Sequence, residues 1–73
     1  MSESMRKEIA HFESKGFVIL FTGKSIEDDE YIVAENGGLA FVVRNQGEHS
    51  RKFSIVKLCE PSKAIAIAKR HCI

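Results

Sequence analysis

Two segments of the chain carry polar side chains that could bind a charged partner or take part in catalysis. The carboxylates Glu27, Asp28, Asp29 and Glu30 are consecutive, and such a run could attract a cation or a basic partner. The run lacks the alternate-residue spacing and central glycine of a calcium loop, so we interpret it either as a solvated loop or as a contact for a basic partner. The second segment places His49 beside Arg51 and Lys52.

A histidine next to such cations could bind or cleave RNA, with the cations binding the phosphates. Histidines in polar loops are mostly solvated, and this is the interpretation that we favour for His49. Cys59, Cys72, His71 and His49 also supply donor atoms for zinc, but no Cys-x-x-Cys or His-x-x-x-His spacing pairs them. The sequence therefore predicts no catalytic residue, no metal and no cofactor, and hence a protein that is not an enzyme.

The charge of the chain is unevenly distributed. Residues 1–36 hold four basic and eight acidic side chains, a net charge of −4, whereas residues 37–73 hold seven basic and two acidic, a net charge of +5. We expect opposite patches on one body, which could steer a charged partner. This split is weaker evidence for nucleic-acid binding than a uniformly basic chain would be.

The size and composition predict one small folded domain over residues 1–73. Hydrophobic residues make up 44% of the chain, enough for a core. The longest apolar run, residues 17–21, is far shorter than the roughly 20 residues of a membrane span. Two cysteines and no signal-peptide pattern indicate free thiols in a reducing compartment. We therefore expect a cytoplasmic protein.

The first half of the chain predicts a helix followed by a strand. Ser2 or Ser4 can cap a helix over residues 4–15, and Gly16 suits the left-handed residue that ends it. Residues 17–22 are aromatic and β-branched without polar alternation, which predicts a central strand covered on most of both faces and ended by Gly23.

The clearest local signal is Asn36-Gly37, the dipeptide preferred in a type I′ hairpin turn. With these two residues as the loop, Glu35 pairs with Gly38, and side chains alternate between two faces. One face is the predicted core and carries Ile32, Ala34, Leu39, Phe41 and Val43. The other face is half polar and carries Tyr31, Val33, Glu35, Ala40, Val42 and Arg44.

The last third of the chain predicts a fourth strand and a closing helix. In the strand over residues 52–58, Val56 and Leu58 leave the face shared by Phe53 and Ile55, which a bulge or burial on both sides could explain. Pro61 suits the first turn of the helix, although the alternating Ile and Ala residues also allow a strand. The predicted fold is α+β, a four-stranded antiparallel sheet with an N-terminal and a C-terminal helix (α-β-β-β-β-α).

The second face of the hairpin is the candidate site. One of the two helices could cover its apolar strip; if none does, an apolar strip with a charged rim is typical of a protein-binding surface. The candidate contact residues combine this strip with the charged segments: Tyr31, Val33, Arg44, Arg51, Lys52, Asp28 and Asp29.

Taken whole, the chain resembles phage-encoded transcription regulators. The likeness runs from Met1-Ser2-Glu3-Ser4-Met5 through Glu35-Asn36-Gly37-Gly38 to Lys69-Arg70-His71-Cys72-Ile73. It implies a protein of the host bacterial cytoplasm that binds bacterial RNA polymerase, blocks initiation and can act as an antiterminator. Apart from this resemblance, we expect a monomer without a membrane partner.

A second likeness points to another class. Residues 8–17 resemble the opening helix of small mRNA-cleaving toxins with a double-stranded-RNA-binding-like fold. Those toxins need a Gly-Ser-His segment on an early strand, where this chain has Phe21-Thr22-Gly23-Lys24-Ser25. The alternative function is therefore a small RNA-binding module without catalysis, and direct nucleic-acid binding is the less expected of the two.

Overall fold

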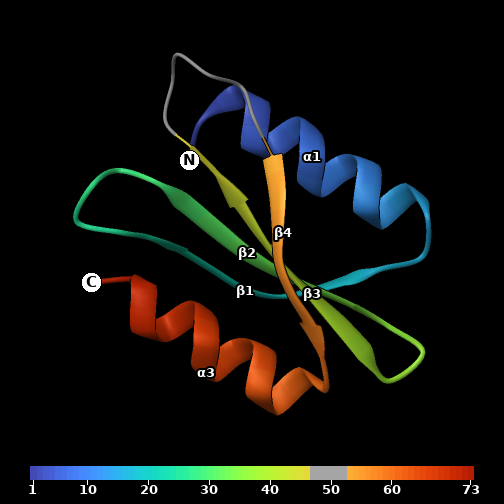
Figure 1. Cartoon of the computed structure of the whole chain (residues 1–73). Coiled ribbons are helices and arrows are strands. Elements are labelled where there is room, and N and C mark those ends of the chain that lie inside the picture. Colours follow the sequence, from blue (N-terminus) through green and yellow to red (C-terminus); the bar gives the residue numbers. More distant parts are fainter. Residues whose placement is uncertain (47–52) are drawn as a thin grey trace.

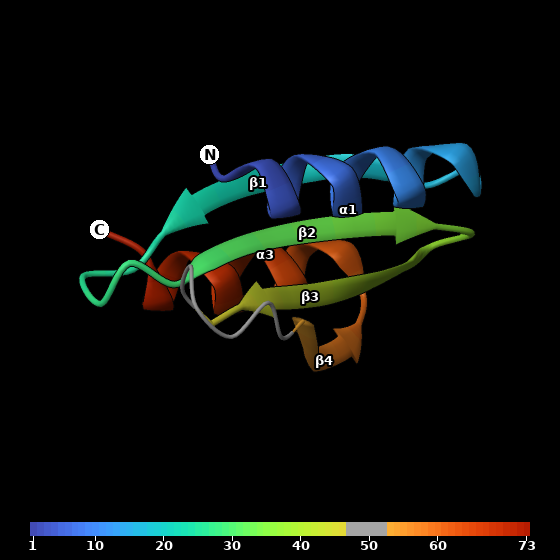
Figure 2. The ribbon, with the colours of Figure 1, turned by 90° about the horizontal axis from the view of Figure 1, so that it is seen from above.

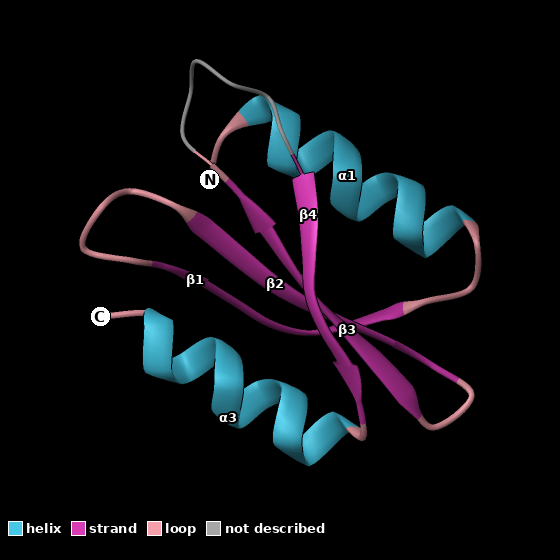
Figure 3. Ribbon diagram, in the orientation of Figure 1, coloured by secondary structure: helices cyan, strands magenta, loops and turns pink. Residues whose placement is uncertain are grey.

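A computed structural model describes residues 1–46 and 53–73 of the chain (Figures 1 and 3). The elements in chain order are α1 (Glu3–Ser14), β1 (Val18–Lys24), β2 (Glu30–Asn36), β3 (Leu39–Asn45), β4 (Phe53–Cys59) and α3 (Pro61–His71). The strands form one antiparallel sheet in the order β1-β2-β3-β4. This confirms the predicted α+β fold and shows that the C-terminal segment is a helix.

Both ends of α1 follow from its sequence. Ser2 is the N-cap, and its hydroxyl accepts a hydrogen bond from the amide of Met5 at 3.2 Å. At the other end Gly16 is left-handed (φ 90°), and the amide of Phe17 donates to the carbonyl of Phe12 at 3.0 Å. The rings of Phe12 and Phe17 then meet edge to face at 5.2 Å, which completes a Schellman motif.

The prediction that residues 17–22 form a central strand is wrong. β1 is an edge strand, its side chains alternate between half-buried and exposed, and Val18 is 57% exposed. Gly23 does not end the strand. It lies within the strand where an added Cβ would come within 2.8 Å of Cys72 Sγ, so its small size serves packing against the end of α3.

A β-bulge explains the unbroken apolar run in β1. Ile19 pairs with Ala34 and Phe21 with Val33, so Leu20 is the extra residue between them. Because of the bulge, Ile19 lies on the α1 side of the sheet and Phe21 on the α3 side. Consecutive apolar residues therefore serve two faces on an exposed edge strand.

The predicted hairpin loop is displaced by one residue. Gly37 and Gly38 form the loop, both with positive φ (64° and 86°), and Asn36 pairs with Leu39. Two glycines adopt this conformation without a steric penalty, so the Gly-Gly pair takes the turn in place of Asn36-Gly37. Each residue of β2 consequently faces a partner two positions further along β3, which leaves the two predicted faces intact.

The sheet separates two apolar clusters (Figure 1). On the α1 side the buried residues are Met5, Ile32 and Val43, with Ile9, Phe12, Ile19, Phe41 and Phe53 packed against them. On the α3 side they are Tyr31, Val33, Ala40, Val42, Ala64 and Ala68. Ala64 and Ala68 are the small residues that bring α3 close to the sheet, and both faces of the hairpin are therefore core.

Candidate partner-binding surface

The structure covers the apolar strip that the sequence offered as a binding surface. Tyr31 is 3% exposed and Val33 is fully buried, because α3 lies across this face and contacts all four strands. Of the two alternatives for the strip, the covering helix is the one realised. Tyr31 and Val33 belong to the core and present no surface to a partner.

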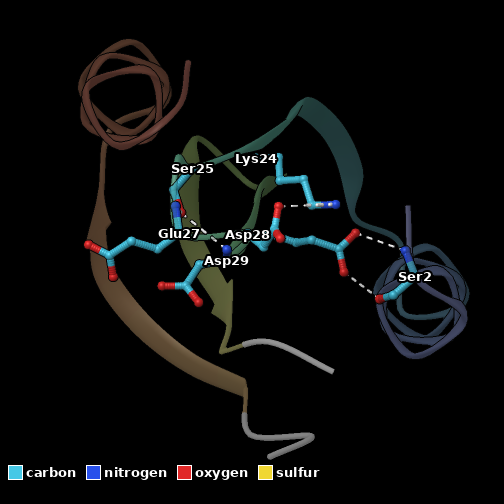
Figure 4. Close-up of polar contacts among 7 residues, drawn as sticks. Ser2, Lys24, Ser25, Glu27, Asp28 and Asp29 are labelled. Carbon is cyan, nitrogen blue, oxygen red and sulfur yellow. Dashed lines mark hydrogen bonds and ion pairs between the residues drawn. The ribbon is translucent and has the colours of Figure 1, made fainter. Parts of the chain in front are cut away.

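Three of the predicted charged contacts pair within the chain. Arg44 Nε lies 3.5 Å from Asp29 Oδ2. The exposed Lys24 and Asp28 approach to 3.7 Å, as Figure 4 shows. The Lys24–Asp28 pair is exposed and therefore contributes little to stability, whereas the Arg44–Asp29 pair is partly buried. Arg51, Lys52 and His49 lie outside the described residues.

The acidic loop between β1 and β2 is held by a serine. The hydroxyl of Ser25 accepts hydrogen bonds from the amides of Glu27 and Asp29 at 3.2 and 3.1 Å (Figure 4). Asp28 takes a left-handed conformation at φ 68° to close this turn. In residues 1–46 and 53–73, no three His, Cys, Asp or Glu side chains gather as metal ligands.

Glu30, the fourth carboxylate of the acidic run, has a separate structural role that the sequence did not reveal. It is buried, and its carboxylate accepts hydrogen bonds from the amide of Ser2 at 2.9 Å and from the Ser2 hydroxyl (Figure 4). Asn45 Nδ2 donates to the hydroxyl of Ser4 at 3.3 Å. These bonds join the first turn of α1 to β2 and β3.

Tyr31 packs against His71 at the C-terminal end of α3 and lies near the charged groups of Arg44 and Asp29. Its ring stacks on that of His71 at 5.0 Å between centroids and 6° between planes. Burial raises the pKa of Tyr31 above its ordinary value of 10.0, while the charge of Arg44 and a hydrogen bond with it act in the opposite direction and Asp29 adds to the rise. Burial also raises the pKa of Cys72, which disfavours the reactive thiolate. Both cysteines are free and half-buried.

Tyr31 is the only tyrosine of the chain and there is no tryptophan, so its titration can be followed by ultraviolet absorbance. We expect the phenolate of the folded protein to appear above pH 10.0 and that of the urea-unfolded protein at its ordinary pH. Because the folded pKa is the higher one, this group's contribution to stability is complete below the unfolded pKa and falls as pH rises through the folded pKa. Coincident folded and unfolded titration curves would contradict the burial of Tyr31 against α3.

An exposed apolar area of the sheet lies on the α1 side of β3 and β4. In Figure 2, α1 lies along β1 and β2, and no described helix accompanies it over β3 and β4. A helix about 10 Å wide covers roughly two strands spaced about 4.8 Å apart, so one helix leaves half of this face open. Leu39, Ile55 and Leu58 are 52%, 61% and 48% exposed there.

The register of β4 gathers these residues on one surface. Val42 pairs with Lys57 and Val43 with Ile55, so Val56 is bulged, which confirms one of the two predicted explanations. The bulge brings Leu58 opposite Phe41 on the α1 side, and the prediction that Leu58 lies on the other face is wrong. We define the β3–β4 patch as Leu39, Phe41, Ile55 and Leu58.

One side of the patch is bounded by aromatic side chains and α1. The ring of Phe41, which is half-buried, lies 5.8 Å from that of Phe17 and 6.3 Å from that of Phe12. Near the start of β4, Phe53 lines a groove with Lys7 and His11 of α1. An open apolar floor with a polar rim is an arrangement that can bind another protein.

Neither described helix is long and apolar enough to cross a membrane. Comparisons with models of known protein families, with curated proteins and with solved structures find no match to this chain.

Proposed function

We propose that this protein is a non-enzymatic binding protein that acts on a larger protein through the β3–β4 patch. The observation that carries the proposal is the exposure of Leu39, Ile55 and Leu58, each near or above half, on one open part of a sheet face. In a domain this small, every apolar side chain left in water forgoes stabilisation that burial would provide. Binding a partner over the patch would bury that area.

The face of β4, rather than its free backbone edge, is the proposed contact. The bulge at Val56 interrupts the regular spacing of backbone groups that an added strand needs. Lys57 lies beside the bulge, and charged residues on edge strands oppose strand addition. The apolar side chains of the same strand remain accessible on the α1 side.

Bacterial RNA polymerase is the proposed partner, and inhibition of initiation or antitermination the proposed effect. This choice rests on the resemblance to phage-encoded transcription regulators. The patch supports the mode of action, because a regulator without catalysis has to act by occupying a surface of the enzyme.

Charge introduced into the patch tests the proposal. We expect Ile55→Asp combined with Leu58→Asp to weaken binding to purified bacterial RNA polymerase at least tenfold, because a partner would have to desolvate two carboxylates. Both side chains are about half exposed, so the double variant should melt close to wild type. Biolayer interferometry with immobilised protein measures the affinity, and circular dichroism the melting.

Val18→Asp is the matched control, since Val18 is 57% exposed on the other edge strand and pairs with Glu35 on the α3 side. It should bind as wild type does. Equal binding by the patch variant and wild type would remove the patch as the site. Failure of wild-type protein to bind the polymerase would remove this partner, whatever the variants do.

A further inference from the structure

The outer side of α3 is a basic surface. Ala64 and Ala68 are fully buried against the sheet, whereas Lys63, Lys69 and Arg70 are exposed on the other side of the helix. The segment from Pro61 to the last residue contains no Asp or Glu. The cationic side chains therefore point away from the sheet on a helix whose opposite side is packed against it.

These cations have no partners within the described part of the chain. The two ion pairs of residues 1–46 and 53–73 use Lys24 and Arg44, and neither involves α3. Lys57 of β4 adds a further cation on this side, because its partner Val42 belongs to the α3-side cluster. Four unpaired cations thus lie on one side of the sheet.

The spacing of the cations suits a row of phosphates. Lys63 and Arg70 are seven residues apart, about 10 Å along a helix that rises about 1.5 Å per residue. That length matches about three phosphates of one strand at an axial spacing of about 3.4 Å. Ala66 lies exposed between them, and its small side chain allows a backbone to approach closely.

We propose that the outer face of α3, together with Lys57, binds the phosphate backbone of double-stranded nucleic acid without sequence preference. A protein partner is disfavoured because exposed anchors such as Tyr, Trp or Phe, which dominate protein interfaces, do not occur on α3. A membrane surface is disfavoured as the partner. Helices that bind membranes insert large apolar side chains into the lipid, whereas the exposed side of α3 has only Ala66 between its cations.

The acidic groups near α3 lie away from its outer side. Glu35 is on the α3 side of the sheet, but it is half-buried on β2 beside Ala40 and Val18. Glu60 is the N-cap and precedes the first turn of the helix. The β1–β2 loop lies near the other end, where the amide of Ile73 donates to the carbonyl of Lys24 at 3.1 Å. Two carboxylates of that loop, Asp28 and Asp29, are paired with Lys24 and Arg44.

This surface extends the proposed function, because α3 covers one face of the sheet and the β3–β4 patch lies on the other, α1-side face. A partner protein and a nucleic acid could be held at once. The inference stands on different residues from the patch, so the patch variant Ile55→Asp/Leu58→Asp should bind nucleic acid as wild type does.

The test is fluorescence anisotropy with a labelled duplex DNA of mixed sequence at several salt concentrations. Four phosphate contacts predict a slope of log K against log salt of about −3 to −4, so affinity should fall about 100-fold between about 50 and 200 mM salt. Reversing Lys63→Glu and Arg70→Glu should remove measurable binding at about 200 mM and reduce the slope by about 2 at low salt.

The matched control is Arg6→Glu with Lys7→Glu on α1, which lowers the formal net charge of +1 by the same four units. It should retain most of the binding. Equal losses in the two double variants would show a net-charge effect and overturn the inference. So would wild-type protein that binds vesicles containing anionic lipid but not the duplex, or that binds neither.

Discussion

Replacing Tyr31 by alanine should destabilise the protein by about 3–5 kcal/mol, the usual cost of truncating a buried aromatic side chain. The ring is 3% exposed, packs in the α3-side cluster and stacks on His71, so the variant loses contacts to both β2 and α3. Domains of this size have only about 4–11 kcal/mol of stability in total. Urea denaturation followed by circular dichroism should show a large fall in the midpoint.

Tyr31→Phe separates the ring from its hydroxyl. It keeps the packing and the stacking on His71 and removes only the hydroxyl, so its cost should be far smaller, about 0.5–1.5 kcal/mol. A Tyr31→Ala variant with a midpoint equal to that of Tyr31→Phe would show that α3 does not pack on the ring. The structure thus changes the expectation for Tyr31 from an effect on binding to an effect on folding.

The helices and strands could be predicted because the residues that start and end them are close together in the sequence. Ser2, Gly16 and Pro61 mark helix ends by backbone chemistry alone, and the Gly-containing turn marks the hairpin. The turn was misplaced by one residue, yet the faces of β2 and β3 were correct. A loop shift of one residue moves each partner by two positions, and two positions return a side chain to the same face.

The bulges were harder to predict. In β1 the residues around Leu20 are all apolar, so no polar residue reveals where the alternation changes phase. In β4 the apolar residues change from odd positions (Phe53, Ile55) to even positions (Val56, Leu58), and this change made a bulge one of two explanations. A bulge can be recognised in the sequence only when it interrupts an alternation of polar and apolar residues.

The candidate surface was misassigned because it depends on where the helices lie. Both faces of the hairpin are apolar enough for a core, and the sequence did not decide whether a helix covers the second one. Ala64 and Ala68, spaced by four, form the flat side of α3 that covers it. Leu39 and Phe41 lie on the predicted face of the sheet. Because α1 covers only part of that face (Figure 2), Leu39 remains exposed.

The α1-side cluster makes the second strong prediction, with a control of the same residue type. Ile32 is fully buried between Met5 and Val43, so Ile32→Ala should cost about 2–5 kcal/mol through lost burial and the cavity that remains. Ile26 is 81% exposed in the β1–β2 loop, and Ile26→Ala should change stability by less than about 0.5 kcal/mol. Both variants remove the same atoms, so intrinsic side-chain differences largely cancel and the gap between their urea midpoints reports the packing of α1 on the sheet. If Ile32→Ala unfolds at the same urea concentration as Ile26→Ala, α1 does not pack on this face and the open half of the sheet is larger than the β3–β4 patch.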